Sequence, residues 1–195
     1  MRKLILMLLS VVVLSALFYP VFAQDTGGTP KFVGLDVYQR ADQAYQNQQY
    51  EQAILDFSIV ILLNPTFTDP YIKRAESYIA LKNFDAALVD LNHLLKIPLL
   101  DAATKAEAYT ARGEISRDQN DLNAAMADYN AAIRAAPDGP QAYYDRGLIY
   151  LAQGEYDKSL KDLNQVASIA PKYIPTYYYL GVLHNQAKQY ADAVK

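Results

Sequence analysis

The residues best suited to chemistry in this 195-residue chain are arginines that each precede an aspartate by 16 positions. A guanidinium holds a carboxylate or a phosphate through two parallel hydrogen bonds, so these arginines could bind an anionic ligand or the aspartates themselves. Because an aspartate accompanies every arginine, we expect structural ion pairs rather than an anion site. The four expected pairs are Arg40–Asp56, Arg74–Asp90, Arg112–Asp128 and Arg146–Asp162.

No other pattern points to catalysis or to a metal. The chain has no Cys, which excludes disulfides, thiolate zinc sites and a cysteine nucleophile. His93 has no second ligand at helical spacing, and His184 occupies a position at which we expect packing between helices. Neither a Gly-rich phosphate loop nor a G-x-S-x-G motif occurs. We therefore expect no enzyme activity, no cofactor and no metal.

The spacing of the pairs predicts the elements that hold them. Successive arginines are 34, 38 and 34 residues apart, and a period of this length is typical of solenoids. Each period contains two amphipathic segments with a small residue at a fixed position, where two helices can cross closely. These small residues are Ala41, Ala75, Gly113, Gly147 and Gly181 in the first segments and Ala53, Ala87, Ala125, Ser159 and Ala193 in the second.

The turn between the two helices of a unit favours a residue in the left-handed conformation, which Gly adopts at the lowest cost. Gly154 and Asn120 suit that position, whereas Gln48, Lys82 and Lys188 do not. A further turn at Lys188 implies a second helix of the fifth unit that begins at Tyr190.

The ends of the units carry helix-stopping and helix-starting residues. Asp69 and Asp101 are expected to cap the first helices that follow them. The 38-residue interval is expected to be absorbed in Pro98–Glu107, as a short loop and an extra turn of helix. A proline, which interrupts a helix, closes each unit at Pro65, Pro98, Pro137 and Pro171.

This arrangement resembles the tetratricopeptide repeat family. The family pattern of aromatic, Gly, Tyr, small, bulky and Pro is present in the fourth unit as Tyr143, Gly147, Tyr150, Ser159, Leu163 and Pro171. The resemblance covers residues 34–195 and implies an all-α, right-handed superhelical solenoid of antiparallel helix-turn-helix repeats. About five units are expected, at 34–67, 68–101, 102–139, 140–173 and 174–195. The last is incomplete, and we expect the natural chain to continue beyond Lys195.

The resemblance also implies a binding surface, because the first helices of the family's units line a concave wall. The wall runs from acidic residues to aromatic and apolar ones, which suits a peptide with a basic end and an apolar end. Alternatively, its apolar residues contact a continuation of the solenoid. The Lys and Asn with which some members grip C-terminal carboxylates are absent. The implied wall residues are Tyr38, Asp42, Tyr45, Ile72, Glu76, Glu114, Arg117, Tyr144, Leu148, Leu151, Tyr178, Val182 and Asn185.

The N-terminal residues 1–23 are typical of a secretory signal. Arg2 and Lys3 precede an apolar run, and small residues before Gln24 predict cleavage after Ala23. An uncleaved anchor is the alternative, because the run to Phe22 is about as long as a spanning helix requires. Residues 24–33 are expected to form a flexible linker. Both alternatives place residues 24–195 outside the cytoplasm, in a secreted or periplasmic protein.

The charge of the chain limits its partners. The net charge is −3, and it becomes −5 when Arg2 and Lys3 are removed with the signal. An acidic chain without a basic cluster is unsuited to nucleic acid or to an anionic membrane. We therefore expect a non-catalytic scaffold that binds a protein or peptide. The alternatives are an accessory module of a larger secreted enzyme that continues beyond residue 195, and a membrane-tethered envelope assembly factor.

Overall fold

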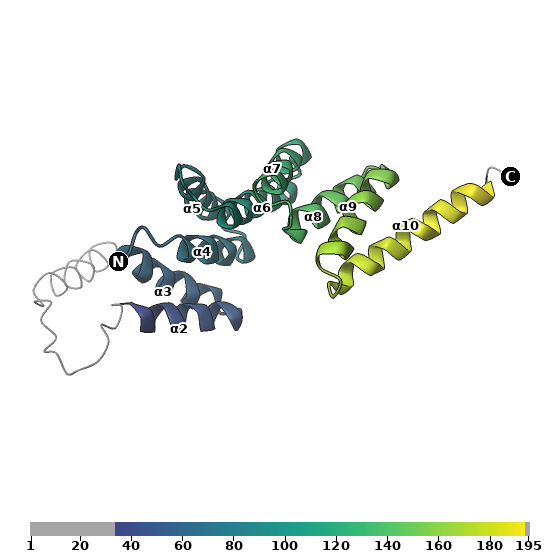
Figure 1. The fold of residues 1–195 in the computed structure, drawn as a ribbon. Coiled ribbons are helices and arrows are strands. Elements are labelled where there is room, and N and C mark those ends of the chain that lie inside the picture. The colour runs from purple at the N-terminus through teal and green to yellow at the C-terminus, as the bar shows by residue number, and fades with distance from the viewer. Residues whose placement is uncertain (1–33, 194–195) are drawn as a thin grey trace, which may run out of the picture. The chain divides into compact units, whose positions relative to one another are not determined.

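The computed structural model describes residues 34–193, with side chains up to residue 186, so the expected signal and linker lie outside the described residues. All regular structure in the described range is helical, which confirms the expected all-α repeat solenoid (Figure 1). None of its helices is long and apolar enough to cross a membrane. They are α2 (Leu35–Gln46), α3 (Tyr50–Leu63), α4 (Asp69–Ala80), α5 (Phe84–Leu95), α6 (Ala102–Asp118), α7 (Leu122–Ala135), α8 (Pro140–Ala152), α9 (Tyr156–Ile169) and α10 (Ile174–Ala193).

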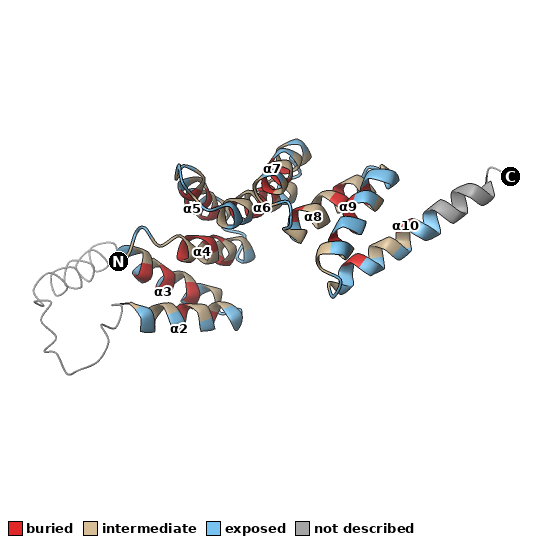
Figure 2. Ribbon diagram, viewed as in Figure 1, coloured by how far each residue is buried: buried red, intermediate tan, exposed pale blue. Residues whose placement is uncertain are grey.

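The small residues let the two helices of each pair cross closely, and buried residues follow the seams between the helices (Figure 2). A Cβ atom on Gly113 of α6 would lie 2.7 Å from the ring of Tyr129 on α7, so only glycine fits there. At Gly147 the corresponding distance to Leu163 is 3.3 Å. The large residues that fill the seams are fully buried at Phe57, Leu91, Tyr129 and Leu163.

The predicted turns are present in the first four pairs. Gln48, Lys82, Asn120 and Gly154 have φ angles of 59°, 58°, 64° and 75°, all in the left-handed region. The chain therefore uses this conformation even where the residue is not glycine, at a cost of about 1 kcal/mol for each such residue. The helical hairpin, rather than the preference of the turn residue, determines the backbone here.

The two expected caps have different outcomes. Asp101 does cap α6, since its side chain accepts a hydrogen bond of 2.9 Å from the backbone N–H of Thr104. The prediction for Asp69 is wrong, because α4 begins at Asp69 itself and Thr68 is the cap residue, without a side-chain bond. The predicted extra turn is present, since α6 has 17 residues and α4 has 12.

The fifth unit differs from the prediction. α10 continues without a turn through Lys188 and Tyr190 as far as Ala193. A turn would need a left-handed lysine, as at Lys82, and within the described residues no second helix of this unit packs against α10 to offset the cost of that conformation. An unbroken helix keeps its backbone hydrogen bonds instead. Consequently Gly181 crosses no helix and has nothing within 4 Å of a built Cβ, and His184 is exposed rather than packed.

All four Arg–Asp pairs are present, each within one helix pair. The guanidinium donates two hydrogen bonds of 2.6–2.8 Å to the two carboxylate oxygens of its aspartate. All four aspartates are buried, and a buried charge is tolerated only when it is paired and hydrogen-bonded. The pairs therefore join the two helices of each repeat.

Three of the arginines also bind the preceding repeat, which the sequence analysis missed. Arg74 donates to Ser58 and Arg112 donates to Asn92, each at 2.9 Å, and Arg146 donates to Asn130. The three acceptors occupy one repeat position on α3, α5 and α7. The same position on α9 is Asn164, which is exposed, because Leu180 replaces the arginine that would reach it.

An aromatic ring covers each of these three guanidinium groups. The rings belong to tyrosines three positions earlier on the same helix, with centroids 5.5–5.8 Å from the guanidinium carbon. Such cation–π contacts stabilise a partly desolvated arginine. The repeated aromatic position of the first helices is therefore explained by the arginine that follows it, at Tyr71, Tyr109 and Tyr143.

We predict that Arg146→Ala lowers the free energy of unfolding by about 3 kcal/mol, because it leaves the buried Asp162 without its counter-charge and removes a donor from Asn130. Denaturant unfolding followed by circular dichroism measures this change. Arg40→Ala is the matched comparison, because it also leaves a buried aspartate, Asp56, without its partner, but Arg40 is 59% exposed and forms no bond to a preceding repeat within the described residues. Arg146→Ala should therefore be the more destabilising of the two. Equal midpoints would show that the bond to Asn130 adds nothing, and an Arg146→Ala midpoint equal to that of the wild type would contradict the prediction.

Candidate functional site

The first helices of successive repeats touch one another, α2 with α4, α4 with α6, and α6 with α8. We call the surface that these helices share the inner wall. It is the surface on which the sequence analysis placed the candidate binding residues. The structure brings them into three groups, one at each end of the wall and one in its middle.

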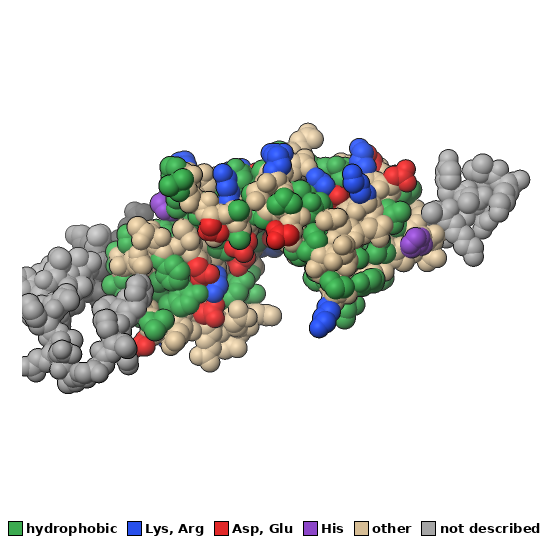
Figure 3. Space-filling model, in the orientation of Figure 1, with side chains coloured by type: hydrophobic (Ala, Val, Ile, Leu, Met, Phe, Trp, Pro, Cys, Tyr) green, Lys and Arg blue, Asp and Glu red, His purple; other side chains and the backbone are tan. Residues whose placement is uncertain are grey.

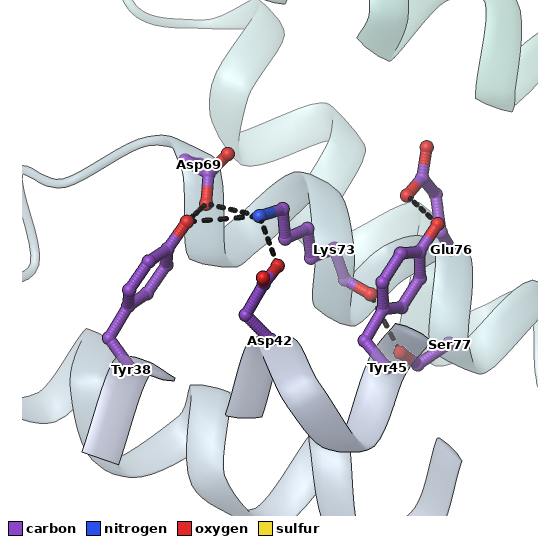
Figure 4. Close-up of polar contacts among 7 residues, drawn as sticks. All are labelled: Tyr38, Asp42, Tyr45, Asp69, Lys73, Glu76 and Ser77. Carbon is purple, nitrogen blue, oxygen red and sulfur yellow. Dashed lines mark hydrogen bonds and ion pairs between the residues drawn. The ribbon is translucent and has the colours of Figure 1, made fainter. Parts of the chain in front are cut away.

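The first group surrounds Lys73, between α2 and α4 (Figure 4). Its amine donates hydrogen bonds to Asp42 at 2.6 Å and to Tyr38 at 2.9 Å, and lies 3.4 Å from Asp69. The Tyr38 hydroxyl donates to Asp69 at 2.7 Å. Burial lowers the pKa of Lys73, but its hydrogen bonds to Asp42 and Tyr38 outweigh this and leave the pKa raised. Asp42 is therefore neutralised within the chain and is not a free acidic contact.

Tyr45 and Glu76 form the next contact along the wall, where the tyrosine hydroxyl donates to the carboxylate at 2.7 Å (Figure 4). Burial raises the pKa of both groups. Ile72, which was expected on the wall, is only 5% exposed and packs in the core with Leu91 and Ala108. That prediction was wrong because α4 and α6 touch along the wall and cover this position.

A single spacing relates the contacts between α2 and α4. Tyr38 and Asp69, Asp42 and Lys73, and Tyr45 and Glu76 are each 31 residues apart. Lys73 was not predicted from the sequence, because the positions of wall residues were inferred for each helix separately. The spacing of 31 residues between complementary side chains is the sequence signal that identifies it.

The second group lines a cavity of about 470 Å³ between α4, α6 and α8. Four carboxylates border it, Glu76 from α4, Glu107 and Glu114 from α6, and Asp138 from the segment before α8, and most of the remaining lining is alanine. Figure 3 shows acidic side chains gathered over the middle of this face. The extra turn of α6, residues 102–106, contributes Ala103 and Ala106 to the lining, and Glu107 follows it directly.

The carboxylates of the cavity lack a cation. Burial, reinforced by Asp145, raises the pKa of Glu114 to about 7. Burial, reinforced by Glu76, also raises the pKa of Glu107. Arg117, expected as a wall contact, instead donates to the buried Asp145 at 2.9 Å. Within the described residues Glu107 and Glu114 form no salt bridge, so this part of the wall is an unbalanced negative site.

The third group lies where α8 meets α10. Tyr144 packs edge-on against Tyr173, with ring centroids 5.1 Å apart, and against Tyr179 at 6.0 Å. Burial raises the pKa of Tyr144 to about 12. Tyr178, in contrast, is 69% exposed. The other candidate residues at this end are the half-buried Leu148, Leu151 and Val182 and the exposed Asn185.

Along the inner wall, acidic surface is therefore followed by aromatic surface. The negative charge of the wall is centred on Glu107 and Glu114 rather than on Asp42. Among the described residues, no group of His, Asp and Glu has a geometry that could hold a metal ion. The arrangement can bind a cation next to an apolar surface.

Comparisons with known proteins agree with this fold. A family model described as TPR repeat matches residues 113–154, and one described as tetratricopeptide repeat matches residues 140–173. No curated protein matches the sequence.

Several solved structures have the same fold. A crystal structure of MamA is 25% identical with a TM-score of 0.59, covering 79% of this chain and 88% of that one. MamA from Desulfovibrio magneticus RS-1 is 17% identical with a TM-score of 0.61, covering 83% and 89%. The first TPR of Spaghetti (RPAP3), bound to the HSP90 peptide SRMEEVD, is 22% identical with a TM-score of 0.54, covering 62% and 93%. The repeated helix pairs, the matched units and these likenesses agree, and the helix pairs of this chain are tetratricopeptide repeats.

Proposed function

We propose that this chain is a non-catalytic scaffold that binds a protein or peptide segment on its inner wall, outside the cytoplasm. The tetratricopeptide fold itself indicates a protein interaction scaffold, and the structure of the first TPR of Spaghetti contains a bound peptide. The placement outside the cytoplasm is supported by the sequence of residues 1–23 alone.

The unbalanced acidic cavity is the observation that supports this function most strongly. Two carboxylates with raised pKa values, the half-buried Glu114 and the more exposed Glu107, lie in a hollow where neither forms a salt bridge within the described residues. Ionising them there is costly, and a cationic group brought in by a partner would remove that cost. A Lys or Arg side chain suits the shape as well, because its methylene stem can pack against the alanines while its charge meets the carboxylates.

The surroundings of the cavity limit the partner further. The peptide bound to the first TPR of Spaghetti, SRMEEVD, has acidic residues near its end. The middle of the inner wall in this chain has negative charge, so it would repel such a segment. Towards α10 the wall offers the exposed Tyr178 and the half-buried Leu148 and Leu151. We infer a ligand segment in which a basic residue is followed by apolar ones.

We predict that selection of a displayed random peptide library on the wild-type protein enriches Lys or Arg near apolar residues. Selection on Glu107→Gln/Glu114→Gln should lose this enrichment, and the selected peptides should bind the variant at least about tenfold more weakly, because hydrogen bonds between charged groups are replaced by neutral ones. Fluorescence anisotropy measures the affinities.

The matched control is Asp85→Asn/Asp157→Asn, which removes the same net charge from exposed positions on α5 and α9. This variant should bind the selected peptides like the wild type. Peptides without basic residues, or equal losses in the two double variants, would overturn the proposed function.

The stability of the unliganded protein should depend on pH through Glu114. Its folded pKa of about 7 lies above the ordinary 4.5, so the folded state binds more protons than the unfolded state between these values. The contribution of Glu114 to stability is therefore fully present below about pH 4.5 and is lost as the pH rises through about 7. We predict that Glu114→Gln is more stable than the wild type by about 2 kcal/mol at pH 8, and that the difference shrinks by pH 5. Urea unfolding at several pH values tests this, and a difference independent of pH would contradict it.

A further inference from the structure

The outer surface of α3 carries a row of exposed apolar side chains that no described residue covers. Leu55, Ile59, Leu62 and Leu63 are 61%, 41%, 77% and 49% exposed. Their spacing places them on one face of the helix, and we call this row the α3 stripe. Contiguous apolar surface on a soluble protein marks a site of interaction with a protein or a membrane.

The repeat itself shows that the fold does not require this apolar face. The positions of Leu55, Ile59 and Leu62 correspond on α9 to Lys161, Gln165 and Ser168, which are equally exposed. In both α3 and α9, the face opposite these exposed positions packs against the rest of the protein, with buried residues at matching positions. The α3 stripe is therefore a property of the first repeat and not of the repeat architecture.

The chain enters the first repeat beside this stripe. A Cβ atom on Gly34 would lie 3.2 Å from the Cδ1 atom of Leu63, so the first described residue lies next to the C-terminal end of the stripe. By sequence, those residues include the apolar run Leu4–Phe22, separated from the repeat by a polar segment of ten residues, 24–33. The membrane-directed part of the chain and the apolar face of α3 are thus connected by a short link.

The size and charge of the stripe favour lipid over a second copy of the chain. A stable protein interface involves about 20–30 residues and about 800 Å² on each side, far more than four side chains supply. A lipid surface needs no complementary shape, and the apolar face of a helix sinks about 5–10 Å into it. Because α3 contains no Lys or Arg, attraction to anionic headgroups cannot contribute.

We propose that, in the chain that retains residues 1–23 (the alternative to cleavage after Ala23), the α3 stripe rests on the surface of a lipid bilayer with neutral headgroups. The N-terminal apolar segment is then the second attachment of the chain to that bilayer. A single weak attachment gives marginal, reversible binding, whereas two on the same molecule give a stable one. The inner wall is built from the first helices, and α3 is a second helix, so docking leaves the peptide site accessible.

The absence of cysteine allows a direct test, since a single introduced thiol can be labelled. The full chain, residues 1–195, carries a polarity-sensitive fluorophore at Leu62→Cys, with Ser168→Cys, the same repeat position on α9, as the matched control. On addition of phosphatidylcholine vesicles, the label at position 62 should shift to shorter wavelength and be quenched by lipid-attached quenchers. The label at position 168 should do neither.

A variant in which α3 carries the outer residues of α9 distinguishes contact of the α3 stripe with the bilayer from attachment through the N-terminal segment alone. In Leu55→Lys/Ile59→Gln, the label at position 62 should no longer shift to shorter wavelength when vesicles are added. Its quenching by lipid-attached quenchers should fall on the order of tenfold. Peptide binding on the inner wall should stay unchanged. No shift at position 62, or equal shifts at both positions, would overturn the proposal. A shift at position 62 without vesicles that grows with protein concentration would also overturn it, in favour of contact between copies of the chain.

Discussion

The stack of repeats depends on one interaction, in which an arginine of one helix forms hydrogen bonds to two other helices. Arg112, for example, extends from α6, binds the buried Asp128 on α7, and also reaches Asn92 on α5 in the preceding repeat. Asp128 could not stay ionised at its buried position without this partner. The same bonds therefore satisfy a buried charge, close a helix pair and set the position of the next pair.

This constraint explains the regularity of the inner wall and also its one irregular place. Because Arg74 joins the first two repeats, α2 and α4 are held at a fixed offset, and side chains 31 residues apart meet across them, as Asp42 and Lys73 do. The four-residue excess between the second and third repeats lengthens α6 without disturbing the arginine contacts at Arg112. The additional turn adds Ala103 and Ala106 to the lining beside Glu107, so part of the cavity forms where the period is broken. A local insertion can thus extend a cavity of the solenoid while the framework is unchanged.

Much of the helical framework could be predicted from the sequence, because the same pattern of residues occurs in each repeat. The small residues at the crossings, the left-handed turn at Asn120 and the Arg–Asp pairs all follow from positions that recur in phase. Contacts between repeats were harder to predict. Ile72 was placed on the wall although α6 covers it, and the bond from Arg74 to Ser58 was not foreseen. Such contacts depend on the offset between repeats, which the pattern within one repeat does not contain.

The candidate site was predicted only in outline for the same reason. An acidic wall was expected from Asp42, Glu76 and Glu114, but only the structure shows that Lys73 balances the first of these and that burial raises the pKa of the last. Whether a carboxylate is available to a ligand depends on its neighbours across the repeat boundary. The end of the solenoid was also mispredicted, since α10 continues as one helix where the repeat pattern implied a turn.

The coupling between repeats is tested most directly by a double-mutant cycle on Arg112 and Asn92, which lie on different repeats. The free energies of unfolding of the wild type, Arg112→Ala, Asn92→Ala and the double variant give the interaction energy of the pair. If the arginine joins adjacent repeats, this energy is about 1 kcal/mol or more in favour of the pair. An interaction energy of zero would show that the bond to the preceding repeat does not hold the repeats together.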